Sequence, residues 1–238
     1  MKVAVIQPSY IPWLGYFNMI KWADIFIFYD DVQYDNNGWR NRNKILVNNK
    51  EKWLTLSIDR KSLSNNLKER ILNKIQLTNK DQFENHKRLL EIYYQKSKNL
   101  LILEQLYFEQ LNKISFLSEA VIIHTSNLCQ FLNIKTKLIK SSDFDFAKSN
   151  DEFLKDPIQK RNHKLLMLLK EVGCKEYMSG FSAKNYLDLE LFESHSITVH
   201  WNKYSEYFPD PKMSIIHYLL KHGRSEVIQY QEKFFIDI

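Results

Sequence analysis

The chain contains few residues that crosslink or bend a protein. Its 238 residues include 2 Cys, 5 Gly and 5 Pro. Cys129 and Cys174 lie far apart and form no Cys-x-x-Cys pair, so the sequence predicts neither a zinc site nor a redox motif. We expect both to be buried thiols in a reducing compartment. The scarcity of Gly and Pro excludes long flexible linkers, so those that are present carry information.

Long apolar runs are also missing. The first residues, MKVAVIQP, are interrupted by Pro8 too early for the apolar region of a signal peptide. No stretch approaches the roughly 18 uninterrupted apolar residues that a membrane span requires. We therefore expect a soluble, cytoplasmic protein with no membrane span.

The net charge of +6 is spread through Lys-rich and Asn-rich stretches. No stripe of basic residues alternates with aromatic ones, so a solvated surface is favoured over nucleic-acid binding. Small anionic substrates such as sugar nucleotides are compatible with this charge. None of the 7 histidines forms a ligand pair of the H-x-x-x-H type, and we predict no metal site.

The first thirty residues alternate between β and α patterns. Residues 2–6 (KVAVI) predict a buried strand, 14–23 a helix, and the run ADIFIFYDDVQ a second strand. This βαβ order is typical of an open parallel sheet. Next, KILV and WLTLSI predict a hairpin around NNKEK. Residues 67–132 predict a helical section that covers the site or forms a lid over it.

The second half of the chain returns to alternating strands and helices. KTKLIKSSDF predicts a strand and loop, DPIQKRNHKLLMLLKEVGC a helix capped by Gly173, and KEYMSG and ITVHWNKY two strands. SIIHYLLKHG predicts a helix capped by Gly223, followed by a tail from Ser225 to Ile238. The sequence thus predicts one α/β domain over residues 1–238, with an open, mostly parallel sheet.

Ligands of open parallel sheets bind at the carboxyl ends of the strands. Three polar clusters follow predicted strands: QPSYIPWLGY, YDDVQYDNNGWRNRN and SGFSAKNYLD. In the first, Gly15 near a helix start permits an anion to approach the backbone. The order of strand, WLGY and helix is similar to the H-x-G-H loop of the nucleotidylyltransferase and adenylate-forming superfamily. Trp13 and Tyr16 replace the two histidines, which argues against nucleotidylyl transfer even on a shared fold. Alternatively, these rings pack the helix onto the sheet.

The second cluster begins with a pair of carboxylates, Asp30 and Asp31. Adjacent strand residues point to opposite faces, so at most one of them faces the site, and Asp30 is favoured over Asp31. A carboxylate there could orient a ribose or serve as a general base, and the alternative is that it caps a helix or turn. Arg40 and Arg42, beside Trp39, could bind phosphate in bidentate fashion. The alternative for both is a solvated hairpin edge.

The third cluster has small and hydroxylic residues around a turn, namely Ser179, Gly180 and Ser182, followed by Lys184 and Tyr186. Such a loop binds phosphate or caps a helix. Outside the clusters, His86 is a candidate acid or base, because its segment DQFENHKRLL is crowded with polar residues. The other histidines are expected to be structural.

Taken together, IQPSYIPWLGYF, ADIFIFYDDVQY, WRNRNKI, YMSGFSAKNYLD and SIIHYLLKHG resemble the successive motifs of the WbqC-like family. These bacterial proteins are encoded among genes for O-antigen and other surface polysaccharides. The resemblance runs from Met1 to about Gly223, and the family's pattern falls on all three clusters. The candidate substrate-binding residues are these family positions together with Lys184 of the third cluster: Gln7, Tyr10, Trp13, Gly15, Tyr16, Gln33, Trp39, Arg42, Asn43, Ser179, Gly180, Lys184 and Tyr186.

The resemblance implies a transferase that acts on a nucleotide-linked amino sugar, by N-acyl or aminoacyl transfer, with acyl-coenzyme A or an acyl carrier as donor. Arg42 and the amides around Gly15 and Gly180 would hold the anionic part. Aromatic residues of the first two clusters would line the pocket, and Asp30 or His86 would act as the general base. The alternatives are an ATP- and magnesium-dependent ligase that forms an adenylate, and a non-catalytic sugar-nucleotide-binding or scaffold protein.

Overall fold

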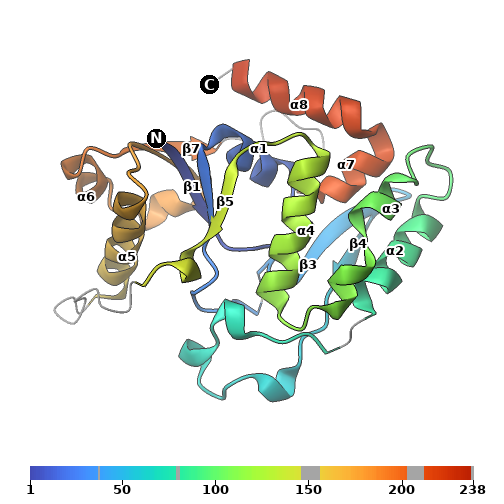
Figure 1. Ribbon diagram of the computed structural model, residues 1–238, viewed down its shortest axis with the longest axis horizontal. Coiled ribbons are helices and arrows are strands. Elements are labelled where there is room, and N and C mark those ends of the chain that lie inside the picture. Colours follow the sequence, from blue (N-terminus) through green and yellow to red (C-terminus); the bar gives the residue numbers. More distant parts are fainter. Residues whose placement is uncertain (37, 79–80, 146–155, 203–211, 237–238) are drawn as a thin grey trace. The chain divides into compact units, whose positions relative to one another are not determined.

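The computed structural model describes residues 1–36, 38–78, 81–145, 156–202 and 212–236 (Figure 1). The described residues fall into two compact units. Unit 1 comprises Met1–Ile6, Met19–Tyr29 and Thr136–Lys203, and unit 2 comprises Gln7–Asn18, Asp30–Lys135 and Tyr204–Ile238. The chain thus passes from unit 1 to unit 2 after each of its first two strands.

Unit 1 contains a parallel sheet, which confirms the predicted open parallel α/β class. Its described strands are β1 (Lys2–Ile6), β2 (Ile25–Phe28), β5 (Lys137–Lys140), β6 (Glu176–Gly180) and β7 (Thr198–Asn202). They pair in the order β5-β2-β1-β6-β7, and every pair is parallel. Counted along the sheet's own strands, the order is 3-2-1-4-5, which is that of a doubly wound sheet. The winding reverses between β1 and β6, where such sheets bind ligands.

Both faces of the central strands are buried. On one face, Val3, Val5 and Ile27 pack in a cluster with leucines of helix α5 (Pro157–Glu171) and with Phe192 of α6 (Leu189–Ser194). On the opposite face, Ala4 and Phe26 are 0% exposed. This two-sided burial is why these strands have unbroken apolar runs rather than an alternating pattern.

The predicted glycine caps are present. Helix α5 begins after Asp156, whose carboxylate accepts a hydrogen bond from the Gln159 N–H at 3.1 Å. It ends before Gly173, which has a φ of 67°. Helix α7 (Ile215–His222) ends at Gly223, which has a φ of 82°. Glycine suits both positions because it has no Cβ atom and therefore adopts a positive φ without steric strain.

Unit 2 is built around a hairpin and several helices. Strands β3 (Arg42–Val47) and β4 (Lys50–Thr55) pair antiparallel, as predicted. Asn48 and Asn49 join them with φ values of 49° and 59°, which is the backbone of a two-residue hairpin turn with positive φ at both central positions. The described helices here are α2 (Gln82–Tyr93), α3 (Ile102–Leu106), α4 (Leu117–Phe131), α7 and α8 (Arg224–Ile236). Helix α1 (Leu14–Trp22) spans the division between the units.

Helix α8 differs from the prediction, which had only a tail after Gly223. The segment has a weak apolar stripe, and its buried side chains include both Val227 and the polar Gln231, each 0% exposed. Such a helix depends on burial of one face against the rest of its unit rather than on a local pattern. None of the helices in the described ranges is long and apolar enough to cross a membrane.

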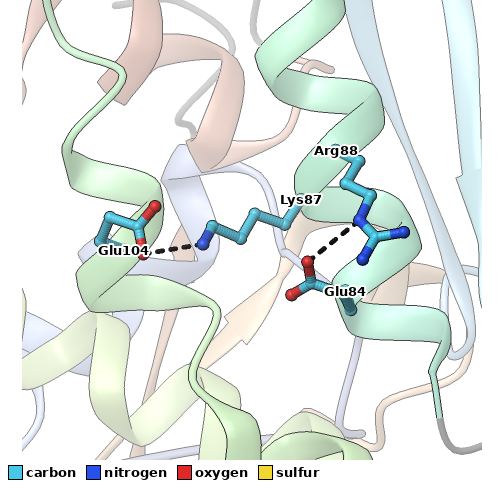
Figure 2. A network of polar contacts seen from close by, with 4 residues as sticks. All are labelled: Glu84, Lys87, Arg88 and Glu104. Carbon is cyan, nitrogen blue, oxygen red and sulfur yellow. Dashed lines mark hydrogen bonds and ion pairs between the residues drawn. The ribbon is translucent and has the colours of Figure 1, made fainter.

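Helices α2 and α3 are joined by an ion pair. Figure 2 shows Lys87 extending from α2 to Glu104 on α3, with 2.7 Å between Nζ and Oε2, beside the pair of Arg88 and Glu84 at 3.1 Å. The hydrogen bond to Glu104 raises the pKa of Lys87. The pair helps to hold the helix that carries His86.

Candidate functional site

The β3–β4 hairpin has one buried face and one open face. Asn43 and Ile45 of β3 are 0% exposed. Arg42 alternates with them and therefore faces the other side, where the register pairs it with Thr55 of β4. The open face thus carries a guanidinium beside a hydroxyl.

The alternation continues beyond the end of β4. Leu56 is 0% exposed, and its N–H donates to the carbonyl of Asn41 at 2.7 Å. Ser57 is exposed, like Thr55 two residues earlier. The two hydroxyl side chains therefore project from the same side of one extended segment.

Helix α2 holds the backbone of this segment through two residues one turn apart. The Gln82 side-chain amide binds Ser57 twice: its oxygen accepts from the Ser57 N–H, and its nitrogen donates to the Ser57 carbonyl at 3.0 Å. The ring of His86 bonds to the backbone of Thr55. Helix α2 therefore anchors the backbone from which the side chains of Thr55 and Ser57 extend.

A pocket of about 680 Å³ lies on the open side of this segment. Three arginines, Arg42, Arg60 and Arg70, contribute to its wall. No Asp or Glu is present among its described lining residues, so positive charge dominates the pocket. The full lining is Tyr34, Asn36, Asn41, Arg42, Thr55, Leu56, Ser57, Ile58, Arg60, Leu63 and Arg70.

Long-range backbone pairing brings Tyr34 and Arg70 together. Gln33 and Ile71 form an antiparallel bridge, and the Tyr34 N–H donates to the Arg70 carbonyl at 2.6 Å. The guanidinium of Arg70 is oriented by a hydrogen bond from Nε to the carbonyl of Ser64 at 2.8 Å. One arginine of the pocket is therefore preorganised by contacts within its own loop.

The phenol of Tyr34 stays neutral at physiological pH. Tyr34 is 4% exposed, and burial raises the pKa of its phenol. The positive charges of Arg42, Arg40 and Arg60 lower this pKa, and the negative charge of Asp35 raises it further. A neutral phenol keeps its proton and can donate it to an anion in the pocket.

A second pocket of about 330 Å³ shares Thr55 and Ser57 with the first. Its other described lining residues are Thr78, Gln82, Asn85, His86 and Leu89, so its hydrogen-bonding groups are neutral. Burial lowers the pKa of His86 to about 4, against the smaller effect of its bond to Thr55. The ring is therefore neutral at pH 7, and its Nδ1 lies 2.7 Å from the hydroxyl of Tyr10.

The first predicted cluster is folded into unit 2 rather than lining either pocket. Tyr10 and Tyr16 are 0% exposed. The Tyr16 hydroxyl donates to the Gln7 carbonyl at 3.2 Å, and Trp13 forms a bridge with Ser214. Gly15 is also buried. The two tyrosines of this loop are thus packed inside unit 2.

Two residues of the second cluster hold that loop in place. Arg40 donates to the Gln7 carbonyl at 3.2 Å and to the Ser9 hydroxyl at 2.8 Å. Asn43 donates to the Ile11 carbonyl at 2.9 Å. Ile11 has a φ of 36°, which is uncommon for a β-branched residue and needs such support.

The remaining predicted residues of the second cluster have varied positions. Asp30 is 2% exposed, and its carbonyl accepts from the Asn73 N–H at 3.0 Å. It lines neither of the two pockets. Gln33 belongs to the bridge that positions Tyr34. Trp39 packs against Trp53, with ring centroids 5.4 Å apart. Of the predicted site residues, Arg42 lines the first pocket and His86 the second.

The third cluster lies at the end of β6 in unit 1. Ser179 accepts a hydrogen bond from the Tyr177 hydroxyl at 3.2 Å, and a Cβ added at Gly180 would meet open space. The Lys184 ammonium lies 5.4 Å from the centroid of the Trp201 ring. The structure therefore groups these residues within unit 1, together with the half-exposed Tyr186.

Sequence reasoning missed most of the arginine pocket. Arg60 and Arg70 lie in a segment of short 3₁₀ turns. The only feature of the sequence that could have indicated a binding site there was the presence of two arginines among Asn and Ser residues. Tyr34 was part of a quoted cluster but was not selected. The pairing of residues 32–34 with 70–72, which brings them together, has no local pattern.

These features define an α/β protein with a doubly wound sheet in one unit and an arginine-lined pocket in the other. The model of the WbqC-like protein family matches residues 7–229, so the chain belongs to this family. It is also similar to "Uncharacterized protein Rv1507c" of Mycobacterium tuberculosis (strain ATCC 25618 / H37Rv), with 33% identity over an alignment of 214 residues. The match covers 87% of this chain and 84% of that protein. No solved structure matches the chain.

Proposed function

We propose that this protein is a cytoplasmic transferase that acts on a nucleotide-linked amino sugar during synthesis of O-antigen or another surface glycan. One observation carries the proposal: Arg42, Arg60 and Arg70 line one pocket without a carboxylate among its described residues. Guanidinium groups match phosphate oxygens in bidentate geometry, and a diphosphate offers enough charge for several of them. The neutral phenol of Tyr34 adds a further donor.

The adjoining pocket supports a sugar rather than a free inorganic anion as the rest of the ligand. The two pockets share Thr55 and Ser57, so one molecule can extend from the charged pocket into the neutral one. Gln82 and Asn85 provide amide groups there, which suit sugar hydroxyls and an amino or acylamino substituent. The volumes of the two pockets are in the range of small-molecule sites.

The proposed step is transfer of an acyl group from a thioester to the sugar amine. The amine nitrogen forms a bond to the acyl carbon, the carbon–sulfur bond breaks, and the amine proton neutralises the leaving thiolate. Asp30 stays a predicted base. For His86, the lowered pKa makes the neutral ring a weak base, which supports a positioning role through Thr55 instead.

The experiment combines binding and turnover. Calorimetry with UDP-linked amino sugars should show at least about tenfold weaker binding for Arg70→Ala and Arg60→Ala, because each loses a charge-assisted contact. Arg161→Ala removes an exposed arginine of α5 and should bind like the wild type. Mass spectrometry of mixtures with acyl-coenzyme A would detect the amide product. Wild-type affinity in both pocket variants would refute the proposed site.

A second candidate function is a non-catalytic sugar-nucleotide-binding protein. It is favoured because the described residues lining the two pockets include no Asp, Glu, Lys or Cys, and the pKa of His86 is lowered. The same experiment separates the candidates. Arginine-dependent binding without turnover of any amino sugar, with acyl-coenzyme A or with ATP and magnesium, identifies a binding protein.

A further inference from the structure

An aromatic surface adjoins the arginine pocket on the hairpin. Trp53 precedes Thr55 by two residues on β4, so its side chain is on the same open face. It is 46% exposed although Trp39 packs against it. The part of the indole that stays exposed beside Trp39 is an aromatic surface that another ring can contact.

Arg42 connects this surface to the pocket. Its guanidinium carbon lies 4.7 Å from the centroid of the Trp53 ring, and the same residue lines the pocket. The ammonium of Lys44 lies 5.0 Å from the same ring and pairs with Glu51. An anion bound to Arg42 would therefore place whatever is attached to it next to the indole.

We propose that Trp53 stacks against the nucleobase of a nucleotide substrate whose diphosphate binds the pocket arginines. This assignment rests on the proposed function and names the part of the substrate that reaches the hairpin. Trp53, Thr55 and Ser57 follow one another on one side of an extended segment, which spans about 13 Å at 3.3 Å per residue. The base, the diphosphate and the sugar would lie along it in that order.

The residues at the two ends of this segment indicate which end contacts the base and which end contacts the sugar. The end near Ser57 adjoins a pocket with amide and hydroxyl groups, which suits a sugar. The end at Trp53 offers an indole face with cationic neighbours, which suits the π-face that every nucleobase has. This recognition is tolerant of base identity, because it uses stacking rather than the base edges.

The test is calorimetry with UDP, GDP, glucosamine 1-phosphate and inorganic pyrophosphate. We expect wild-type protein to bind UDP and GDP at least about fivefold more tightly than pyrophosphate, because the stacking of one base adds to the binding free energy. Trp53→Ala should abolish this advantage, with a much smaller effect on pyrophosphate affinity through its contact with Arg42, and Trp53→Phe should retain most of the advantage. Phe116→Ala, which removes an aromatic side chain that is 39% exposed, is the matched control.

The outcomes separate this inference from the proposed function. The inference is overturned if Trp53→Ala leaves nucleotide affinity unchanged, or if it weakens pyrophosphate and nucleotide equally. It is also overturned if Trp53→Ala weakens the binding of glucosamine 1-phosphate but not the binding of UDP. If UDP binding depends on Trp53 but no amino sugar is turned over, the stacking assignment holds and only the transferase proposal fails.

Discussion

We predict that two buried histidines in unit 2 make the protein less stable in mild acid than at neutral pH. His86 is 8% exposed and His124 1% exposed. Burial lowers the pKa of His86 to about 4 and that of His124 to about 3, and the nearby His86 adds to the effect on His124. His124 is surrounded by the rings of Tyr10, Phe83 and Tyr107, which offer no compensating negative charge.

The direction and size of the effect follow from proton linkage. Because both folded-state pKa values lie below the ordinary histidine value of about 6.5, the unfolded chain takes up protons first. The stability contributed by the neutral rings is complete above about pH 6.5 and is lost as the pH falls toward 4 for His86 and 3 for His124. Between pH 7 and pH 5 the loss is about 2 kcal/mol per ring, or about 4 kcal/mol in total. Carboxylates titrate mainly below this window.

Urea unfolding followed by circular dichroism at pH 7 and pH 5 measures this loss. His124→Gln should show a pH dependence smaller by about 2 kcal/mol than that of the wild type. His195→Gln, at an exposed histidine in unit 1, should keep the wild-type difference. The prediction is contradicted if the wild-type protein has the same free energy of unfolding at pH 7 and pH 5. It is also contradicted if the NMR signals of His86 and His124 titrate near pH 6.5. The NMR measurement needs no variant and so does not depend on the folding of His124→Gln.

Two further substitutions test how unit 2 is held together. Asn43→Asp replaces the amide donor to the Ile11 carbonyl with a carboxyl group at a fully buried position, and we expect the free energy of unfolding to fall by at least about 3 kcal/mol. Urea titration against Asn65→Asp, at an exposed asparagine, checks this, and equal stability of the two variants would contradict it. Lys87→Met keeps the side-chain stem but removes the pair with Glu104, which is 61% exposed, so we expect a loss below about 1 kcal/mol. A larger loss in thermal unfolding would show that α2 depends on this pair.

Local patterns predicted the elements that form by local rules. The apolar run at 2–6, the helix beginning at Leu14 and the run from Ile25 correctly predicted β1, α1 and β2, because strands buried on both faces require unbroken apolar residues. The hairpin and the caps at Gly173 and Gly223 were also confirmed, since positive φ restricts the choice of residue. Helix α8 was missed, because its stability depends on burial within unit 2.

The role of a polar side chain was much harder to predict, because it depends on neighbours that are distant in sequence. Tyr10 was predicted to bind substrate, and no local pattern indicated that its hydroxyl would lie against His86, which is 76 positions away in the sequence. Arg70 had no distinguishing local feature, and it joins Arg42 because residues 70–72 pair with residues 32–34. Periodicity in a sequence shows which face of a segment is buried, whereas a binding pocket depends on which segments fold against one another. The chain's own pattern therefore established its strands, turns and caps, and long-range pairing brought Arg70 into the same pocket as Arg42.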